Sequence, residues 1–128
     1  MAAVTRPVRE AVALVVRHPS DPGRVLAVLR PPDDPELPDV WGLPAGRRRP
    51  AESWADAARR AAREKLGVSL ELGRELARGT AERPAYTLAM RLFEGTITDG
   101  NPQVPQPYPE VTQYHAWRWA TPDLLAPA

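Results

Sequence analysis

The chain of 128 residues is long enough for one domain with its own core, and its 43% hydrophobic and 26% charged residues are ordinary for a globular protein, so we expect a single domain over residues 1–128. The net charge of +1 excludes a nucleic-acid-binding polycation, and the sequence gives no strong nucleic-acid signal. Cysteine is absent, and the apolar run Ala11–Val16 is too short to span a membrane, so we expect a cytoplasmic protein with no disulfide, no thiolate metal site and no membrane partner.

The first third of the chain predicts two buried strands, at Arg9–His18 and Arg24–Arg30. The segment between them, Ser20–Gly23, has the composition of a tight turn, so we expect the two strands to form a hairpin. Proline recurs in Pro31–Asp39, which predicts a rigid loop. A short strand or extended segment follows at Val40–Pro44.

A helix is predicted from Ala51 to Leu66, with Gly67 as the residue that ends it. Small and apolar residues recur on one face of this helix, which we expect to pack on a sheet. These residues are Ala55, Ala58, Ala62 and Leu66.

The second half of the chain predicts three more strands and a short terminal helix. The strands are expected at Val68–Leu72, Ala85–Ile97 and Thr112–Ala120. The run Thr121–Asp123 combines an N-cap residue, a proline suited to the first helical position and an acid in the first turn, which predicts the start of a helix. We expect that helix to be short, because the sequence stops soon afterwards.

The central stretch of the chain resembles the motif of the Nudix hydrolases, G-x5-E-x7-R-E-U-x-E-E-x-G-U, in which U is aliphatic. The residues in register with it are Gly46, Glu52, Arg60, Glu64, Gly67 and Val68. The flanking segments "LPDVWGLPAG" and "YHAWRWATPDLL" resemble the same family, so the resemblance covers nearly the whole chain. It implies an α+β fold, the Nudix-like α/β/α sandwich, with a mixed β-sheet, the motif loop and helix on one face and a short C-terminal helix on the other.

The sequence departs from the motif at two of the three acids of the helix. The first acid is replaced by Ala61 and the last by Lys65, and Glu64 remains. In the family, three carboxylates on this helix face converge on Mg²⁺ ions that bridge a diphosphate. Alanine has no metal-binding group, and an ammonium repels a divalent cation a few ångströms away. We therefore expect no multi-metal cluster on this helix.

A single weakly bound ion is an alternative that the resemblance leaves open. Glu64 is the candidate catalytic residue and metal ligand, helped by a backbone carbonyl near Ala45 or Gly46. Glu110 is a second candidate metal ligand, since it lies in a proline-rich loop where some members of the family supply a further acid. Mg²⁺ often needs only one or two carboxylates, because phosphates and waters complete its coordination. The expected cofactor is therefore weakly bound Mg²⁺ or Mn²⁺, or none.

The other motif residues are interpreted as structural. The resemblance implies that Glu52 and Arg60 brace the junction between the loop and the helix, and that Gly46 and Gly67 meet demands of backbone geometry. The alternative is a solvated charge ladder along the helix, with Glu64 as a surface carboxylate paired to Arg60.

A run of three arginines stands just before the helix, where backbone N–H groups and the helix dipole favour phosphate. A solvated charge run is the alternative reading of these residues. Several members of the family place a phosphate contact at the end of the second strand, where this chain has Arg30. The candidate phosphate-binding residues are Arg30, Arg47, Arg48, Arg49 and Lys65.

These features favour a Nudix-family protein, a hydrolase of nucleoside diphosphate derivatives (a pyrophosphohydrolase) by ancestry, with weak or lost activity. The alternatives are a non-catalytic nucleotide- or polyphosphate-binding module, or a protein-interaction domain on the same fold. The expected partner is a small nucleotide or diphosphate ligand, and a homodimer is compatible with the sequence.

Overall fold

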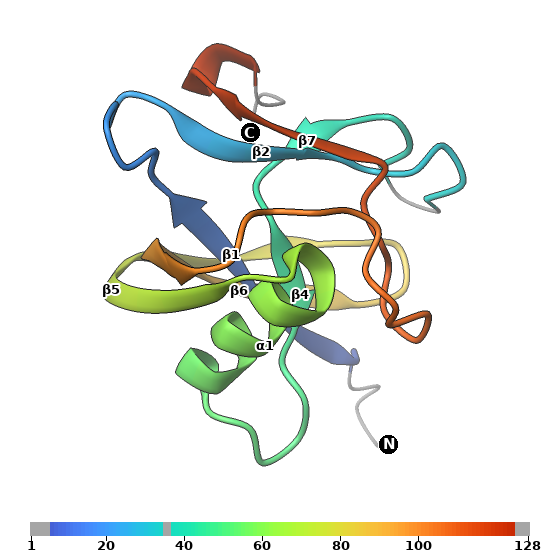
Figure 1. Ribbon diagram of the computed structural model, residues 1–128. Coiled ribbons are helices and arrows are strands. Elements are labelled where there is room, and N and C mark those ends of the chain that lie inside the picture. The colour runs from blue at the N-terminus through green and yellow to red at the C-terminus, as the bar shows by residue number, and fades with distance from the viewer. Residues whose placement is uncertain (1–5, 35–36, 125–128) are drawn as a thin grey trace, which may run out of the picture.

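The computed structural model describes residues 6–34 and 37–124, which form two β-sheets, one α-helix and one 3-10 turn (Figure 1). The α+β class predicted from the sequence is confirmed. In chain order the elements are β1 (Val8–Val16), β2 (Val25–Leu29), β3 (Trp41–Gly42), β4 (Ala45–Arg47), α1 (Trp54–Leu66), β5 (Ser69–Glu82), β6 (Thr87–Asp99), β7 (Ala116–Ala120) and the 3-10 turn η1 (Pro122–Leu124).

The larger sheet has the strand order β4-β1-β6-β5, and the smaller has the order β3-β2-β7. In the larger sheet β1 runs parallel to β6 and antiparallel to β4, while β5 runs antiparallel to β6. The expected mixed sheet is therefore confirmed. Figure 1 shows the smaller sheet above the larger one, with α1 in front of the larger sheet.

The hairpin predicted from β1 and β2 is wrong, because the two strands belong to different sheets. The turn between them does form, with the Arg24 amide donating to the Asp21 carbonyl at 3.0 Å. Past the turn, the backbone pairing between these two segments in the described residues is one isolated β-bridge, which pairs Arg17 with Val25. Turn residues reverse the direction of the chain but do not determine whether the flanking strands pair. Both strands have an apolar face, and burying these faces packs the strands against each other in two layers across the core.

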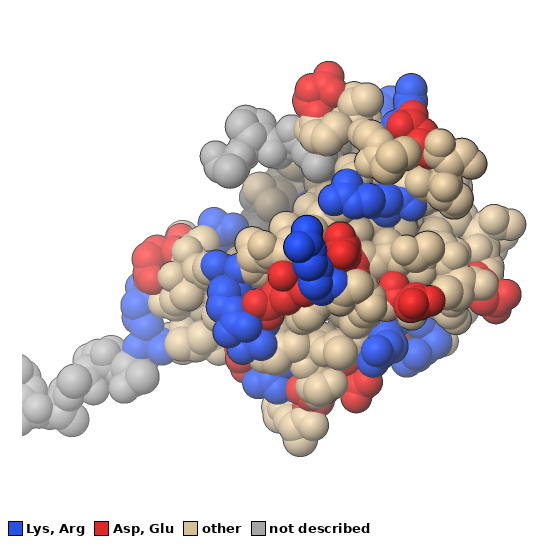
Figure 2. Space-filling view, turned by 90° about the vertical axis from the view of Figure 1, so that its left-hand side faces the viewer, with Lys and Arg blue, Asp and Glu red and all other residues tan. Residues whose placement is uncertain are grey.

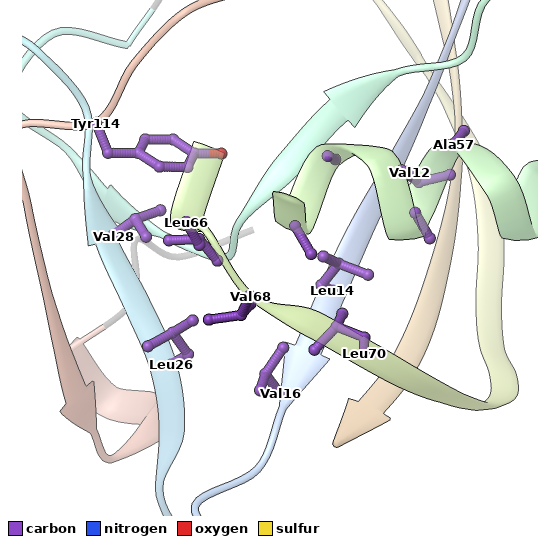
Figure 3. Packing of buried hydrophobic residues seen from close by; sticks show 13 residues of the cluster. Val12, Leu14, Val16, Leu26, Val28, Ala57, Leu66, Val68, Leu70 and Tyr114 are labelled. Carbon is purple, nitrogen blue, oxygen red and sulfur yellow. The ribbon is translucent and has the colours of Figure 1, made fainter. Parts of the chain in front are cut away.

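The core lies between the two sheets and α1. Val12, Leu14 and Val16 alternate along β1 and share this interior with Leu26 and Val28 of β2 (Figure 3). The opposite side of β1, which carries Ala11 and Ala13, faces away from α1, because successive residues of a strand point to opposite sides of the sheet.

Helix α1 begins three residues later than predicted and ends at Leu66, as expected. Ser53 caps its start by accepting a hydrogen bond from the Asp56 amide at 3.0 Å, so the preceding residues belong to the loop. At its end Gly67 takes the left-handed conformation, with φ of 71°. The buried face is broader than predicted, with Ala55 only half-buried and two alanines added to it. Its buried apolar residues are Ala57, Ala58, Ala61, Ala62 and Leu66.

Strand β5 is the element whose observed length differs most from the predicted length. It runs ten residues beyond the expected end at Leu72 and pairs with β6 along nearly its whole length. Register shifts between Leu72 and Glu75 and between Glu75 and Ala77 interrupt the alternation on which the prediction depends. Strands β6 and β7 were both predicted. Strand β6 lies two residues later than predicted, and β7 covers only the last five residues of the predicted range Thr112–Ala120.

The expected C-terminal helix is represented by the single 3-10 turn η1 directly after Thr121. Residues 125–128 lie outside the described part of the chain. In that part, α1 is too short and too polar to serve as a membrane-spanning helix.

Candidate functional site

The motif residues meet where β4 packs against α1. Gly46 is buried on the side of β4 that faces the helix, and a Cβ atom built on it would lie 2.8 Å from the Cβ of Ala61. That distance is shorter than van der Waals contact, so any side chain at position 46 would push the strand away from the helix. This close approach accounts for a glycine at the start of the motif.

Arg60 is buried at the centre of this junction. Its Nε and Nη2 atoms donate to the two carboxylate oxygens of Glu52 at 2.7 and 3.0 Å, and Nη2 also donates to the Arg47 carbonyl. Its Nη1 donates to Glu64 Oε1 at 3.1 Å. One guanidinium thus ties the loop that enters the helix to the helix itself.

The pairing with Arg60 changes the acidity of Glu52. The hydrogen bond from Arg60 lowers the pKa of the Glu52 carboxyl to about 2, against the opposing effect of burial. In turn the bond to Glu52 raises the pKa of Arg60 above its ordinary value. Both groups are therefore charged at neutral pH.

Glu64, the remaining acid of the motif face, is also buried and already engaged. Its Oε1 accepts from Arg60 and from Arg49 Nη2, the latter at 3.4 Å. Glu110 lies exposed in the loop before β7 and does not line the cleft that Lys65 lines. In the described part of the chain, no group of three acidic, histidine or cysteine side chains is placed to hold a metal.

Lys65 reaches across to the carbonyl of Ala45. Its Nζ donates to that oxygen at 2.7 Å and lies 5.2 Å from the centre of the Tyr114 ring. Burial lowers the pKa of Lys65 to about 8, and repulsion from Arg30 and Arg60 adds to the effect. The side chain remains mainly an ammonium at neutral pH.

The donor set does not fit the divalent ion that the motif implies. The Ala45 carbonyl, which could otherwise ligate a metal, accepts from Lys65 and also from the Tyr114 hydroxyl at 3.0 Å. A carbonyl oxygen has two lone pairs, and these two donors occupy both. Ala61 supplies no oxygen and Glu64 is bound by two arginines, so a metal would have to displace existing partners.

A cleft of about 530 Å³ opens over the side of the larger sheet that carries Ala11 and Ala13, and Lys65 from the last turn of α1 reaches its edge. Ala11 and Ala13 of β1 and Leu88 and Met90 of β6 form an apolar floor. Of the described residues that line it, five are cationic and one is acidic. These are Arg9, Arg30, Arg47, Lys65 and Arg83, with Asp34 as the acid.

The structure separates the candidate phosphate-binding residues into two groups. Arg30, Arg47 and Lys65 line the cleft. Arg48 instead binds Glu10 at 2.5 Å and the Glu52 carbonyl at 2.6 Å, and its guanidinium lies 5.1 Å from the centre of the Trp54 ring. Arg49 pairs with Glu64.

Two cleft cations, Arg9 and Arg83, were not predicted as site residues. Arg9 lies 4.2 Å from the centre of the Tyr86 ring, on the same side of β1 as Ala11 and Ala13. The alternation of β1 could have placed Arg9 beside the alanines, had the exposed face of the strand been known. Arg83 follows β5, whose true end the sequence does not reveal.

Comparison with known proteins places nearly the whole chain in one family. A family model of the NUDIX domain matches residues 7–128. A curated protein of Bacillus subtilis (strain 168), "Putative 8-oxo-dGTP diphosphatase", is 33% identical over 86 residues, which are 67% of this chain and 53% of that protein. The chain thus spans about half the length of this relative.

Solved structures share the fold at low sequence identity. The MutT NUDIX hydrolase from Burkholderia pseudomallei has a TM-score of 0.77 and 24% identity, covering 96% of this chain and 90% of its own. The MutT protein from Methanosarcina mazei Go1 has a TM-score of 0.75 and 18% identity, covering 93% of this chain and 80% of its own. At these identities the likeness concerns the fold alone.

The lowered pKa of Glu52 predicts a loss of stability in acid. Its pairing with Arg60 stabilises the fold fully above the ordinary carboxyl pKa, and the contribution is lost as the pH falls from there through about 2. The Glu52→Gln variant should be less stable than wild type at neutral pH by roughly 1–3 kcal/mol, and this deficit should shrink in acid. Urea denaturation across this pH range measures it.

The matched control is Glu71→Gln, which removes an exposed carboxylate from β5. It should keep the wild-type dependence of stability on pH. An equal pH dependence in Glu52→Gln and wild type would show that the Arg60 pair contributes nothing.

The contact between Gly46 and Ala61 predicts a second stability effect. Gly46→Ala should lower the free energy of unfolding by about 1–3 kcal/mol, because the new methyl group overlaps the helix. Gly79→Ala on β5 is the control, since its Cβ would meet no atom within 4 Å and should change stability by no more than about 0.5 kcal/mol. Equal stability of the two variants in denaturant titrations would contradict the close packing of β4 on α1.

Proposed function

We propose that this chain, which belongs to the Nudix hydrolase family, binds a nucleoside diphosphate derivative in the cationic cleft and hydrolyses it weakly or not at all. The observation that carries the proposal is the bond of 2.7 Å from Lys65 Nζ to the Ala45 carbonyl. An ammonium stands here where the family motif has a metal-binding carboxylate.

The charge and shape of the cleft support an anionic ligand with an apolar part. Five cations against one acid among its described lining residues favour a group with several negative charges, such as a diphosphate. The apolar floor at Leu88 and Met90 suits a less polar portion of the same molecule. A nucleoside diphosphate derivative combines both properties.

The carboxylates support the second half of the proposal, impaired hydrolysis. Nudix enzymes generally use divalent ions, which neutralise the diphosphate and help to generate the attacking hydroxide. Here Ala61 offers no ligand, and Glu64 would have to leave Arg60 and Arg49 before it could bind a metal or activate water. Taking a buried carboxylate away from these partners costs free energy, which disfavours the single-metal alternative.

The surface does not favour the alternative of a protein-interaction domain. Among the described residues, the exposed large apolar side chains are Val8 and Leu37, and Leu37 lines the cleft. Acidic and basic side chains are interspersed over the face in Figure 2. The described surface therefore lacks the broad apolar patch that a protein-binding surface would need.

A ligand screen tests the proposed function directly. The name of the Bacillus subtilis relative directs the screen first to 8-oxo-dGTP and dGTP, with inorganic pyrophosphate as the shared fragment. We expect at least one of them to raise the thermal unfolding midpoint in EDTA, because a ligand that binds only the native state stabilises it. Released phosphate or pyrophosphate should remain far below typical enzymatic turnover, roughly 1–1000 per second.

Two results would contradict the proposal. Turnover at ordinary enzymatic rates with Mg²⁺ would show an intact active site. No stabilisation by any phosphate compound, with or without metal, would remove the binding function.

Restoring the acids should restore metal binding. In the double variant Ala61→Glu, Lys65→Glu, calorimetry should show Mg²⁺ or Mn²⁺ affinity raised about tenfold or more, because the helix face again presents three carboxylates. Hydrolysis of the best-binding nucleotide should rise with it. Ala61→Gln, Lys65→Gln is the control of equal side-chain length without the two negative charges, and an equal gain in that variant would argue against a carboxylate effect.

A further inference from the structure

Lys65 holds the place on the Ala45 carbonyl that a metal ion would need. The carbonyl belongs to the residue just before the motif glycine, and Lys65 stands at the position of the last acid of the motif helix. In the arrangement that the motif implies, this carbonyl and an acid at position 65 would both bind a divalent ion. In this chain they instead bond to each other at 2.7 Å.

The contacts of Lys65 hold its position without neutralising its charge. Its hydrogen-bond acceptor is a neutral carbonyl, and its aromatic neighbour Tyr114 is an uncharged ring that is buried and fixed by its own bonds to Ala45. An ammonium has three donors. Within the described residues one of them is used by Ala45, which leaves donors for a ligand in the cleft that Lys65 lines.

Other cations surround Lys65 on the cleft side. Arg30 lowers the pKa of Lys65, so the two positive groups lie close enough to repel each other. Arg47 lines the same cleft with an exposed side chain. Asp34 pairs with Arg30 at 3.3 Å and offsets part of this charge. An anion placed among these cations would relieve their mutual repulsion.

We propose that the Lys65 ammonium is a built-in substitute for the metal ion, so that it contacts the phosphate groups of the ligand directly and Mg²⁺ weakens binding instead of supporting it. This inference rests on the proposed function and deepens it. The expected antagonism has a simple cause, since Mg²⁺ in solution neutralises the phosphate charge that Lys65, Arg30 and Arg47 would otherwise bind.

Calorimetry with inorganic pyrophosphate tests this role of Lys65. Wild type should bind pyrophosphate in EDTA, and added Mg²⁺ should lower the affinity. Lys65→Met removes the charge while keeping an unbranched apolar chain, and should lose about 10–100-fold in affinity in EDTA, the range of one charge-assisted hydrogen bond. Lys65→Glu should bind pyrophosphate only when Mg²⁺ is present.

The control is Arg63→Gln, which removes one positive charge from an exposed position on the same helix and should leave the affinity unchanged. If wild type binds pyrophosphate only with Mg²⁺, the role of Lys65 is wrong while the proposed function stands. This measurement uses wild type alone, so it does not depend on any variant folding. Lys65→Met that binds as tightly as wild type would overturn it as well. Failure of wild type to bind any phosphate compound under either condition would overturn both.

Discussion

The buried guanidinium of Arg60 is the constraint on which the rest of the site depends. It joins Glu52 of the loop and the Arg47 carbonyl at the end of β4 to Glu64 on the helix, and the two carboxylates together compensate its buried charge. The loop that it fixes carries β4, whose Gly46 touches the helix. The same contact holds the backbone ahead of Gly46 within reach of the last turn of α1.

That arrangement separates the parts of the motif that shape the site from the parts that carry its chemistry. The loop, the tight glycine contact and the Arg60 network involve residues that match the family motif. The charged groups at this junction differ from the acids of the family motif. Lys65 donates a hydrogen bond to the Ala45 carbonyl, and Glu64 pairs with both Arg49 and Arg60. The cleft beside this junction is lined by five cationic residues and one acidic residue among those the structure describes.

The sequence predicted those features that depend on local signals or on the whole motif, such as the end of α1 at Gly67 and the mixed sheet. It did not predict that β1 and β2 separate into two sheets, because turn residues carry no information about pairing beyond the turn. The site shows the same limit. Adjacent arginines of one run, Arg47 and Arg48, point to different surroundings because strand alternation separates them, and Arg9 reaches the cleft only through the pairing of distant strands.

In the proposed site the Lys65 ammonium, and not a metal ion, is bonded to the Ala45 carbonyl. Anomalous diffraction from crystals soaked with Mn²⁺ and pyrophosphate tests it most directly, because manganese is located independently of the surrounding light atoms. We expect Lys65 Nζ on the Ala45 oxygen and in contact with a phosphate, with no manganese peak bound to that carbonyl. A peak at coordination distance from the Ala45 oxygen and Glu64, with Lys65 displaced, would contradict it.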